Sequence, residues 1–373
     1  MLPATTDTSS ASSASSSLYQ TSETDSDNAY RRVEKMYRKH HVSNKHGKMV
    51  EADFPDTTHV IDFHNLQNNT PENRQLLEPV VLPNTEIDMK YFEEALEKYN
   101  SYFSQDEYLK NTMRFTKEEL MSKSIYTFKG YPGFYVIKDL MRPEQQIYWI
   151  KQALEQYPNP PNITNHTMKQ GEILDIFKRS VNGDEEAKTL LKKLAWCTLG
   201  YQYEWTTRKY HKDKFVKFPD DIGNFVEMIA CQCGYGPYKP EAAIVNFYSK
   251  DRLMGGHVDD AEYEMSKPIV SLSIGSKSIF LLGGETKDIE PKAIFLESGD
   301  CMLMGGRARY CFHGIARILK DTIPAYLQTA HVDPKYKIYA EYMERDMMRI
   351  NINARQVFVD ENQKKEFDKN LEQ

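Results

Sequence analysis

The second half of the chain consists of short apolar runs that are separated by glycine and polar residues. Runs of this kind are typical of the strands of an all-β core. In residues 268–275 (PIVSLSIG), Val270, Leu272 and Ile274 alternate with Ser271 and Ser273, so this strand has one small polar face. Inside a barrel, such a face leaves room for a ligand. The predicted strands are 243–248, 269–274, 278–282, 293–296 and 301–304.

The first half of the chain is mainly helical in pattern. Residues 143–157 (PEQQIYWIKQALEQY) predict a helix with Pro143 in its first turn and Ile147, Ile150 and Leu154 on one face. Helices are also predicted over 91–102 and 185–194, and a short strand over 134–137. We therefore expect one catalytic unit with a helical support and not two independent domains.

Composition limits the function classes. The chain has 373 residues, and its 48 Lys and Arg against 54 Asp and Glu give a net charge of −6. No run of about 18 apolar residues occurs, which argues against a membrane-spanning helix. The negative total also argues against binding nucleic acid through overall charge. Cations are nevertheless concentrated in residues 31–48, on an amphipathic helical pattern, and in residues 208–214. The first group predicts either a solvated helix docked on the core or a nucleic-acid contact.

The two ends of the chain differ from the middle. Eight Ser and five Thr among the first 25 residues predict a disordered tail over 1–28, and its acidic residues make it a poor transit peptide. Residues 29–125 are interpreted as an extension with a basic amphipathic helix, a loop-rich stretch and a further helix. Residues 126–360 are interpreted as the catalytic domain, with a β-core at about 196–358, and residues 361–373 as a charged tail.

The five cysteines indicate a reducing compartment and not a disulfide scaffold. Cys231 and Cys233 form a C-x-C pair. Structural zinc sites use wider spacings and a second ligand pair, so a buried structural role is favoured over metal binding.

One constellation points to metal chemistry. His257 and Asp259 are two residues apart, so in an extended segment their side chains converge, and His313 follows Asp259 by 54 residues. Two His and one carboxylate form the facial triad of non-haem Fe(II) oxygenases. Alone, this pattern is weak. Asn246 and Tyr248, on one face at the end of the preceding strand, add polar groups nearby.

A polar row lies further along the chain, in residues 349–355 (RININAR). As a strand, this segment projects four polar side chains to one side: Arg349, Asn351, Asn353 and Arg355. An unpaired buried guanidinium is strongly disfavoured. The row therefore predicts either a bound anion, such as a dicarboxylate held by Arg, or an exposed edge strand.

These residues resemble the signature of the AlkB family of Fe(II)- and 2-oxoglutarate-dependent dioxygenases, an H-x-D…H triad followed by R-x5-R. Here the signature reads His257, Asp259, His313, Arg349 and Arg355. The resemblance is closest to the animal homologue 1 branch and extends over about residues 29–360, including 130–134 (GYPGF), 199–205 (LGYQYEW) and 279–284 (IFLLGG). It implies an α+β fold with a double-stranded β-helix (jelly-roll) core and supporting N-terminal helices.

The resemblance also implies roles for the site residues. Fe(II) is expected on His257, Asp259 and His313, with O2 as cosubstrate. The resemblance places 2-oxoglutarate at Asn246, Tyr248, Arg349, Asn351 and Arg355, with Arg349 as the partner of its distal carboxylate. Substrate contacts are expected at Tyr201, Tyr203, Trp205 and Phe177.

Residues 201–214 interleave aromatic side chains with cations. This pattern suits the stacking of an unpaired base and contacts to its backbone. Alternatively, Tyr201 and Trp205 simply pack a core. The predicted contacts to a nucleic-acid backbone are Arg31, Arg32, Arg208 and Lys209.

The leading hypothesis is a nucleic-acid demethylase that acts on methylated bases in tRNA, such as 1-methyladenosine, or in unpaired or structured DNA, such as N6-methyladenine. Formaldehyde, succinate and CO2 would be released. The alternatives are a protein oxygenase, for instance one acting on histone, a zinc hydrolase, and an inactive jelly roll that only binds. We expect a monomer located in mitochondria, in the nucleus or in both, with the cytoplasm as a further location, and no secretion.

Overall fold

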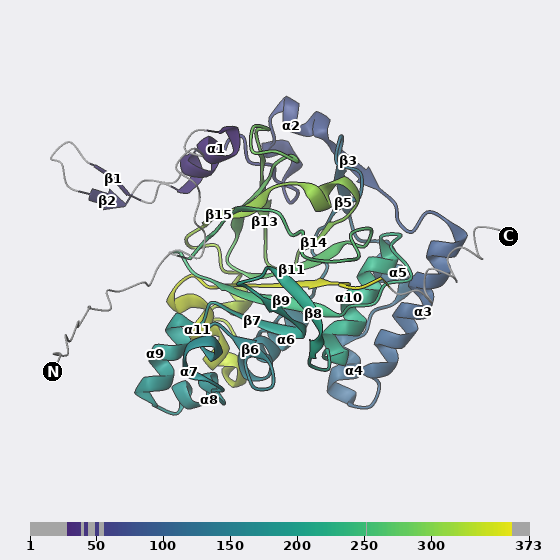
Figure 1. Ribbon diagram of the computed structural model, residues 1–373. Coiled ribbons are helices and arrows are strands. Elements are labelled where there is room, and N and C mark those ends of the chain that lie inside the picture. Colours follow the sequence, from purple (N-terminus) through teal and green to yellow (C-terminus); the bar gives the residue numbers. More distant parts are fainter. Residues whose placement is uncertain (1–27, 39–40, 44–48, 52–55, 251, 360–373) are drawn as a thin grey trace, which may run out of the picture.

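The computed structural model describes residues 28–38, 41–43, 49–51, 56–250 and 252–359 (Figure 1). The predicted tails, residues 1–28 and 361–373, lie almost entirely outside these ranges. Several cations of the 31–48 group also lie outside them. No helix among the described residues is both long and apolar enough to cross a membrane.

Two β-sheets form the centre of the molecule. Within the described residues, the small sheet has four strands in the order β10-β15-β12-β13, and the large sheet has ten, ordered β3-β4-β5-β14-β11-β16-β9-β7-β6 with β8 paired to β7. A separate pair joins β1 and β2. The strands are β1 (His41–Ser43), β2 (Met49–Glu51), β3 (Leu77–Val80), β4 (Ile125–Phe128), β5 (Phe134–Ile137), β6 (Ile163–Thr164), β7 (Trp196–Glu204), β8 (Lys209–Phe215), β9 (Ala242–Tyr248), β10 (Met254–His257), β11 (Ile269–Gly275), β12 (Ser278–Leu282), β13 (Lys292–Leu296), β14 (Cys301–Met304), β15 (His313–Ile318) and β16 (Arg349–Arg355).

The strand order is that of a jelly roll. From β9 the chain crosses to β10 in the small sheet and returns to β11, crosses again to the β12–β13 hairpin and returns to β14, then repeats the crossing through β15 and β16. This confirms the predicted double-stranded β-helix. The alternation in β11 is resolved as expected: Val270, Leu272 and Ile274 pack into the core outside the barrel, so Ser271 and Ser273 face its interior.

Most of the helices cover the outer face of the large sheet, whereas α1 and α2 lie apart from this layer (Figure 1). They are α1 (Ala29–Arg38), α2 (Pro71–Leu76), α3 (Glu86–Tyr102), α4 (Glu107–Met113), α5 (Lys117–Met121), α6 (Pro143–Glu155), α7 (Thr167–Gln170), α8 (Ile176–Val181), α9 (Glu185–Lys193), α10 (Asp220–Gln232) and α11 (Lys337–Arg345), with short 3-10 helices η1 (Leu66–Asn68), η2 (Gly306–Tyr310), η3 (Ala325–Leu327) and η4 (Pro334–Tyr336). Helices α3, α6 and α10 share the largest apolar cluster with β9, β11 and β16.

Helix α10 lies within the region that we interpreted as purely β. Ten of its 13 residues are buried, so it has no broad polar face. Its sequence therefore lacks the amphipathic pattern of a helix and resembles the apolar runs of the strands. Cys231 and Cys233, at and just after its end, are free thiols buried in the same apolar cluster. Neither belongs to a group of metal-ligating side chains among the described residues. Their structural role was the favoured prediction.

Helix α1 docks directly on the small sheet, beside the strand that carries His257. The Tyr30 ring lies against Gly256 and Gly283, where a Cβ at either glycine would clash with it. Tyr30 and Tyr37 share an apolar cluster with Ile279 of β12. The amphipathic helix predicted here therefore docks on the core. The predicted boundary between residues 125 and 126 falls inside β4, which pairs with β5 of the large sheet.

Candidate active site

His257 and His313 lie directly opposite each other on the paired strands β10 and β15, with ring centroids 4.4 Å apart. The Nδ1–H of His257 donates to the carbonyl of Gly255 (2.9 Å), and that of His313 donates to the carbonyl of Cys311 (3.1 Å). These bonds leave the lone pair of each Nε2 available to a metal. Burial and, to a smaller extent, the nearby His257 lower the pKa of His313 to about 4, so His313 is neutral as a ligand must be.

Asp259 completes the metal-binding group. Its Oδ1 lies 3.7 Å from His257 Nε2 and its Oδ2 lies 3.9 Å from His313 Nε2. Burial raises the pKa of Asp259, but the Arg355 guanidinium and the two imidazoles outweigh this effect and hold the pKa well below its usual range. The carboxylate is thus anionic, and the three ligand atoms lie within 4.8 Å of one another, close enough to share one ion.

Two arginines and a glutamate surround this carboxylate. Arg355 Nη1 lies 3.5 Å from Asp259 Oδ2 and donates to Glu262 Oε1 at 2.9 Å. Arg309 donates to the other oxygen, Glu262 Oε2, at 2.9 Å and to the main-chain oxygen of Asp259 at 3.0 Å. Arg309 and Glu262 were missed in the sequence because their spacing matches no motif. The group thus contains two cations, Arg309 and Arg355, and two anions, Asp259 and Glu262, so its net formal charge is zero.

Arg349 is fully buried at the opposite end of its strand, with 0% of its surface exposed. It donates to the hydroxyl of Ser273 (2.6 Å) and to the carbonyl groups of Ser276 (3.3 Å) and Leu296 (3.4 Å), and its Nε has no hydrogen-bond partner in the described structure. No Asp or Glu of the described ranges forms an ion pair with it. Burial lowers the pKa of Arg349 to about 10, yet it remains a cation at neutral pH. A buried cation without a counter-ion fits an anionic ligand.

The other residues predicted around this anion share the same interior face. Asn351 donates to the Ser271 hydroxyl (2.9 Å) and to the Leu272 carbonyl (2.8 Å). Asn246 on β9 is paired in register with Asn351, and Tyr248 with Arg349. All of them are buried. The five side chains predicted for 2-oxoglutarate are therefore assembled along two adjacent strands, so the row is interior and not an exposed edge.

The β7–β8 hairpin carries the predicted substrate contacts. Tyr203 packs against Trp205 (4.8 Å between ring centroids) and Tyr210 (5.2 Å). Arg208, at the tip, forms an ion pair with Asp260 (2.9 Å), next to the metal-binding Asp259. Lys209 is exposed. The structure therefore brings this aromatic and cationic hairpin to the metal-binding group.

Three predicted contacts, Phe177, Arg31 and Arg32, lie outside this hairpin. Phe177 is 2% exposed and stacks on Tyr339 in the helical layer (5.6 Å), so it is a core residue and the prediction of a substrate contact is wrong. The prediction came from the resemblance, which matched Phe177 to an aromatic position by residue type, and residue type does not distinguish a core ring from a contact ring. On α1, Arg31 pairs with the buried Glu34, while Arg32 is exposed.

A second group of possible ligands, His64, Asp139 and Asp300, has another explanation. Both oxygens of Asp300 accept from His64 Nε2 (2.9 and 3.1 Å), and they also accept from the backbone N–H groups of Asp139 (3.1 Å) and Glu297 (2.8 Å). The hydrogen bonds thus occupy this carboxylate within the protein, where it ties the segment around His64 to the barrel.

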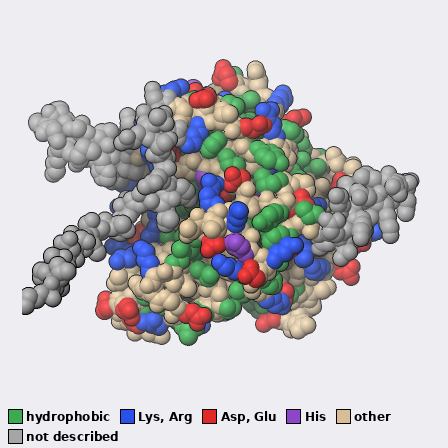
Figure 2. All heavy atoms as spheres, viewed as in Figure 1, with side chains coloured by type: hydrophobic (Ala, Val, Ile, Leu, Met, Phe, Trp, Pro, Cys, Tyr) green, Lys and Arg blue, Asp and Glu red, His purple; other side chains and the backbone are tan. Residues whose placement is uncertain are grey.

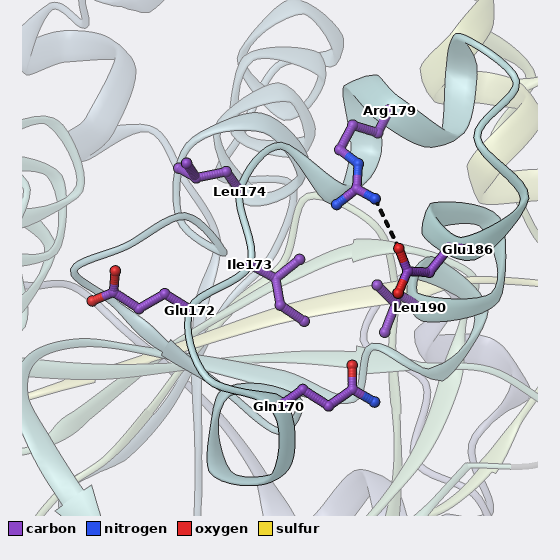
Figure 3. A pocket seen from close by; sticks show the side chains of 7 residues that line it. All are labelled: Gln170, Glu172, Ile173, Leu174, Arg179, Glu186 and Leu190. Carbon is purple, nitrogen blue, oxygen red and sulfur yellow. Dashed lines mark hydrogen bonds and ion pairs between the residues drawn. The ribbon is translucent and has the colours of Figure 1, made fainter.

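A surface pocket lies in the region of α7–α9 (Figure 3). Arg179 and Glu186 form an ion pair (3.1 Å) at its edge. None of the residues that line it comes from the two strands that carry the histidines. The pocket is therefore separate from the metal-binding group. Its lining residues are Gln170, Glu172, Ile173, Leu174, Arg179, Glu186 and Leu190.

Comparison with known proteins agrees with this geometry. The family model of the 2OG-Fe(II) oxygenase superfamily matches residues 133–355, which include every metal-binding and anion-facing residue described above. The DNA N(6)-methyladenine demethylase ALKBH1A of Arabidopsis thaliana is 37% identical over 293 residues, which cover 69% of this chain and 84% of the relative. This chain belongs to the AlkB family of 2OG-Fe(II) oxygenases.

Two further AlkB-family relatives show how broad the similarity is. The nucleic acid dioxygenase ALKBH1 of Homo sapiens is 36% identical over 258 residues, or 62% of this chain and 66% of the relative. The tRNA demethylase abh1 of Schizosaccharomyces pombe is 34% identical over 254 residues, or 62% of this chain and 82% of the relative.

Membership of this AlkB family implies Fe(II), 2-oxoglutarate and O2. The residues present fit them: two imidazoles and a carboxylate suit Fe(II), and the buried, uncompensated Arg349 suits the distal carboxylate of 2-oxoglutarate. A zinc hydrolase would have no use for this arginine. The enzyme is therefore a dioxygenase, as predicted.

Proposed function

We propose that this dioxygenase oxidatively demethylates bases in nucleic acid. The observation that carries the proposal is the position of the β7–β8 hairpin, where aromatic and cationic side chains lie against the metal-binding segment through the Arg208–Asp260 ion pair. Aromatic rings stack on unpaired bases and cations bind the phosphate backbone. The printed names of the relatives, which describe DNA N(6)-methyladenine, nucleic-acid and tRNA activities, support the same class of substrate.

The target base is unpaired in this proposal. A base inside a duplex cannot reach a metal held within a barrel, so single strands, loops or bulges are the substrates. We propose methylated adenine, as 1-methyladenosine in tRNA or N6-methyladenine in unpaired DNA. Bound Fe(II), 2-oxoglutarate and O2 together supply the oxidant for a methyl C–H bond, with succinate and CO2 as co-products. The resulting N-hydroxymethyl group breaks its C–N bond and leaves as formaldehyde, and the nitrogen regains a proton.

The protein's own contribution is positioning and charge. Arg349 holds the distal carboxylate of the cosubstrate, while Asn246 and Asn351 offer amide groups along the same face. The carbonyl groups of Gly255 and Cys311 fix the orientation of the two imidazoles. Arg355 and Arg309 keep Asp259 anionic, and Glu262 balances their charge.

The test is mass spectrometry of nucleosides from bulk tRNA and from denatured DNA before and after incubation with the protein, Fe(II), ascorbate and 2-oxoglutarate. We expect loss of one methylated adenosine together with an equal amount of formaldehyde. The matched control is the His257→Ala protein. If neither pool changes while histone peptides lose methyl groups, the substrate is protein and the proposal is wrong.

A further inference from the structure

A partly exposed group of four aromatic rings lies beside the active site. We call it the flanking platform: Tyr201 of β7, Phe215 at the end of β8, Tyr263 after the metal-binding segment, and Phe358 after β16. Tyr263 stacks on Phe358 with ring centroids 5.2 Å apart and planes at 14°. Tyr201 joins the group through Phe358 (4.8 Å) and Phe215 (4.7 Å). Residues from four separate segments thus form one continuous aromatic surface.

The platform is open to solvent. Phe215 is 51% exposed and Tyr263 is 58% exposed, although few large aromatic side chains in the described ranges are exposed to this extent. Exposed aromatic surface is unfavourable in water and, when several rings are contiguous, is typical of an interaction site. The rings are also well held, because the Tyr263 N–H donates to the Val357 carbonyl (2.8 Å) and ties the two segments together.

The charge around the platform favours an anion. Lys212 Nζ lies 5.2 Å from the centroid of the Phe358 ring. Neither Lys209 nor Lys212 forms an ion pair with an Asp or Glu of the described chain, whereas Lys214 is engaged by Glu204 (3.4 Å). Asp213 and Glu264 are the nearby acids in sequence. Over β8, Figure 2 shows Lys and Arg side chains next to hydrophobic ones, with acidic and histidine side chains among them. Stacking rings beside uncompensated cations are the features of a single-strand nucleic-acid surface.

The platform continues directly from the active site. Tyr263 follows the metal-binding Asp259 by four residues. On β7, Tyr201 is two residues from Tyr203, so both side chains lie on the same side of the strand. The rings thus border both the segment that carries the metal-binding Asp259 and the strand that carries Tyr203.

We propose that the flanking platform stacks the unpaired bases next to the target nucleotide, while Lys212 binds the phosphate between them. This inference rests on the proposed function and deepens it. It assigns the enzyme a preference for single-stranded segments of several nucleotides over isolated methylated nucleosides.

The experiment measures binding of a fluorescein-labelled oligothymidylate of about 12 nucleotides by fluorescence anisotropy. In the Tyr263→Ala and Phe358→Ala proteins we expect the Kd to rise at least about fivefold, as for the loss of one stacked base. Tyr263→Phe keeps the ring and is expected to bind like the parent. Lys212→Gln should lower the slope of log Kd against log salt by about one.

The matched control is Tyr108→Ala, because Tyr108 on α4 is 52% exposed and also has a lysine, Lys335, over its ring (5.6 Å). This substitution should leave the Kd unchanged. An unchanged Kd in both the Tyr263→Ala and the Phe358→Ala proteins, each with a parental melting temperature, overturns the inference. The inference is also overturned if the parent protein sediments as a dimer and these two substitutions dissociate it, because the platform would then serve self-association.

The outcome is separate from that of the proposed function. Oligothymidylate carries no methyl group, so its binding reports on the platform alone. Failure of the parent enzyme to demethylate any nucleic acid would overturn the proposed function even if the platform binds the oligonucleotide.

Discussion

The barrel interior and the β7–β8 hairpin are built in opposite ways. Inside the barrel, the charged groups beside Asp259 are buried and pair with one another in the Arg355–Glu262–Arg309 network. On the hairpin, Arg208, Lys209 and Phe215 are exposed to solvent. In the function that we propose, the buried interior supplies the chemistry and the exposed hairpin contacts the nucleic acid.

The largest expected effect comes from removing a metal ligand. His257→Ala should reduce succinate formation to background, because two ligands do not hold Fe(II) in the facial arrangement. Succinate release with 2-oxoglutarate and O2 measures this directly. His59→Ala, at an exposed histidine, is the control. Full turnover in the His257→Ala protein would show that the buried interior does not carry the chemistry.

The buried charge network should matter greatly for stability. Glu262→Gln leaves Arg309 and Arg355 with less than a full counter-charge, and breaking a buried pair costs about 3–5 kcal/mol. Urea denaturation should show this loss in the free energy of unfolding. The more accessible Glu264→Gln should change it by less than about 0.5 kcal/mol. Equal free energies of unfolding for the two variants would mean that the buried charge network does not stabilise the barrel more than an accessible carboxylate does.

Arg349 should control cosubstrate affinity. Arg349→Ala removes a charge-assisted contact to the distal carboxylate, worth about 1.5–3 kcal/mol, and should raise the KM for 2-oxoglutarate about ten- to a hundredfold. Steady-state kinetics at varied 2-oxoglutarate measures the change. Arg345→Ala, at an exposed arginine of α11, is the control. An unaltered KM would remove Arg349 from the predicted cosubstrate site.

A single hairpin cation should have a smaller effect. Lys209→Gln is expected to weaken binding of single-stranded oligonucleotide only a few-fold and to lower the salt slope by about one, since one phosphate contact is lost. Its melting temperature should match that of the parent because Lys209 is exposed. A large loss of stability would instead show that Lys209 has a structural role, as the buried charges of the barrel do.

The smallest effect concerns pH. Burial lowers the pKa of His64, but its hydrogen bond to the buried Asp300 and the carboxylate charge outweigh this and raise the pKa above the ordinary value. The stabilisation is therefore full below about pH 6.5 and is lost as pH rises through the folded-state pKa. His64→Gln should reduce the free energy of unfolding by at most about 1 kcal/mol at low pH and by less at pH 8. Denaturation at several pH values tests this, and a difference that grows with pH would contradict it.

Much of the barrel was predictable because β-strands have a two-residue period. The strands 134–137, 278–282 and 301–304 were predicted with the bounds that the structure has, and the polar face of β11 indeed meets Arg349 and Asn351. Helix α10 was not predicted, because a helix buried on nearly all sides lacks the amphipathic period. Phe177 was misplaced for a related reason, since residue type alone does not distinguish a core ring from a contact ring.

The sequence by itself indicated the residues expected to bind the metal and cosubstrate, because they match the H-x-D…H and R-x5-R signature of a family whose chemistry needs these particular atoms. Only the tertiary structure decided which distant charges surround them. Arg309 and Glu262 act as partners because chain crossings bring η2 and the segment after β10 together. The same holds for the flanking platform, whose four rings come from segments up to 157 residues apart, Tyr201 to Phe358. Proximity of this kind depends on how strands pair and cross, and no local pattern encodes it.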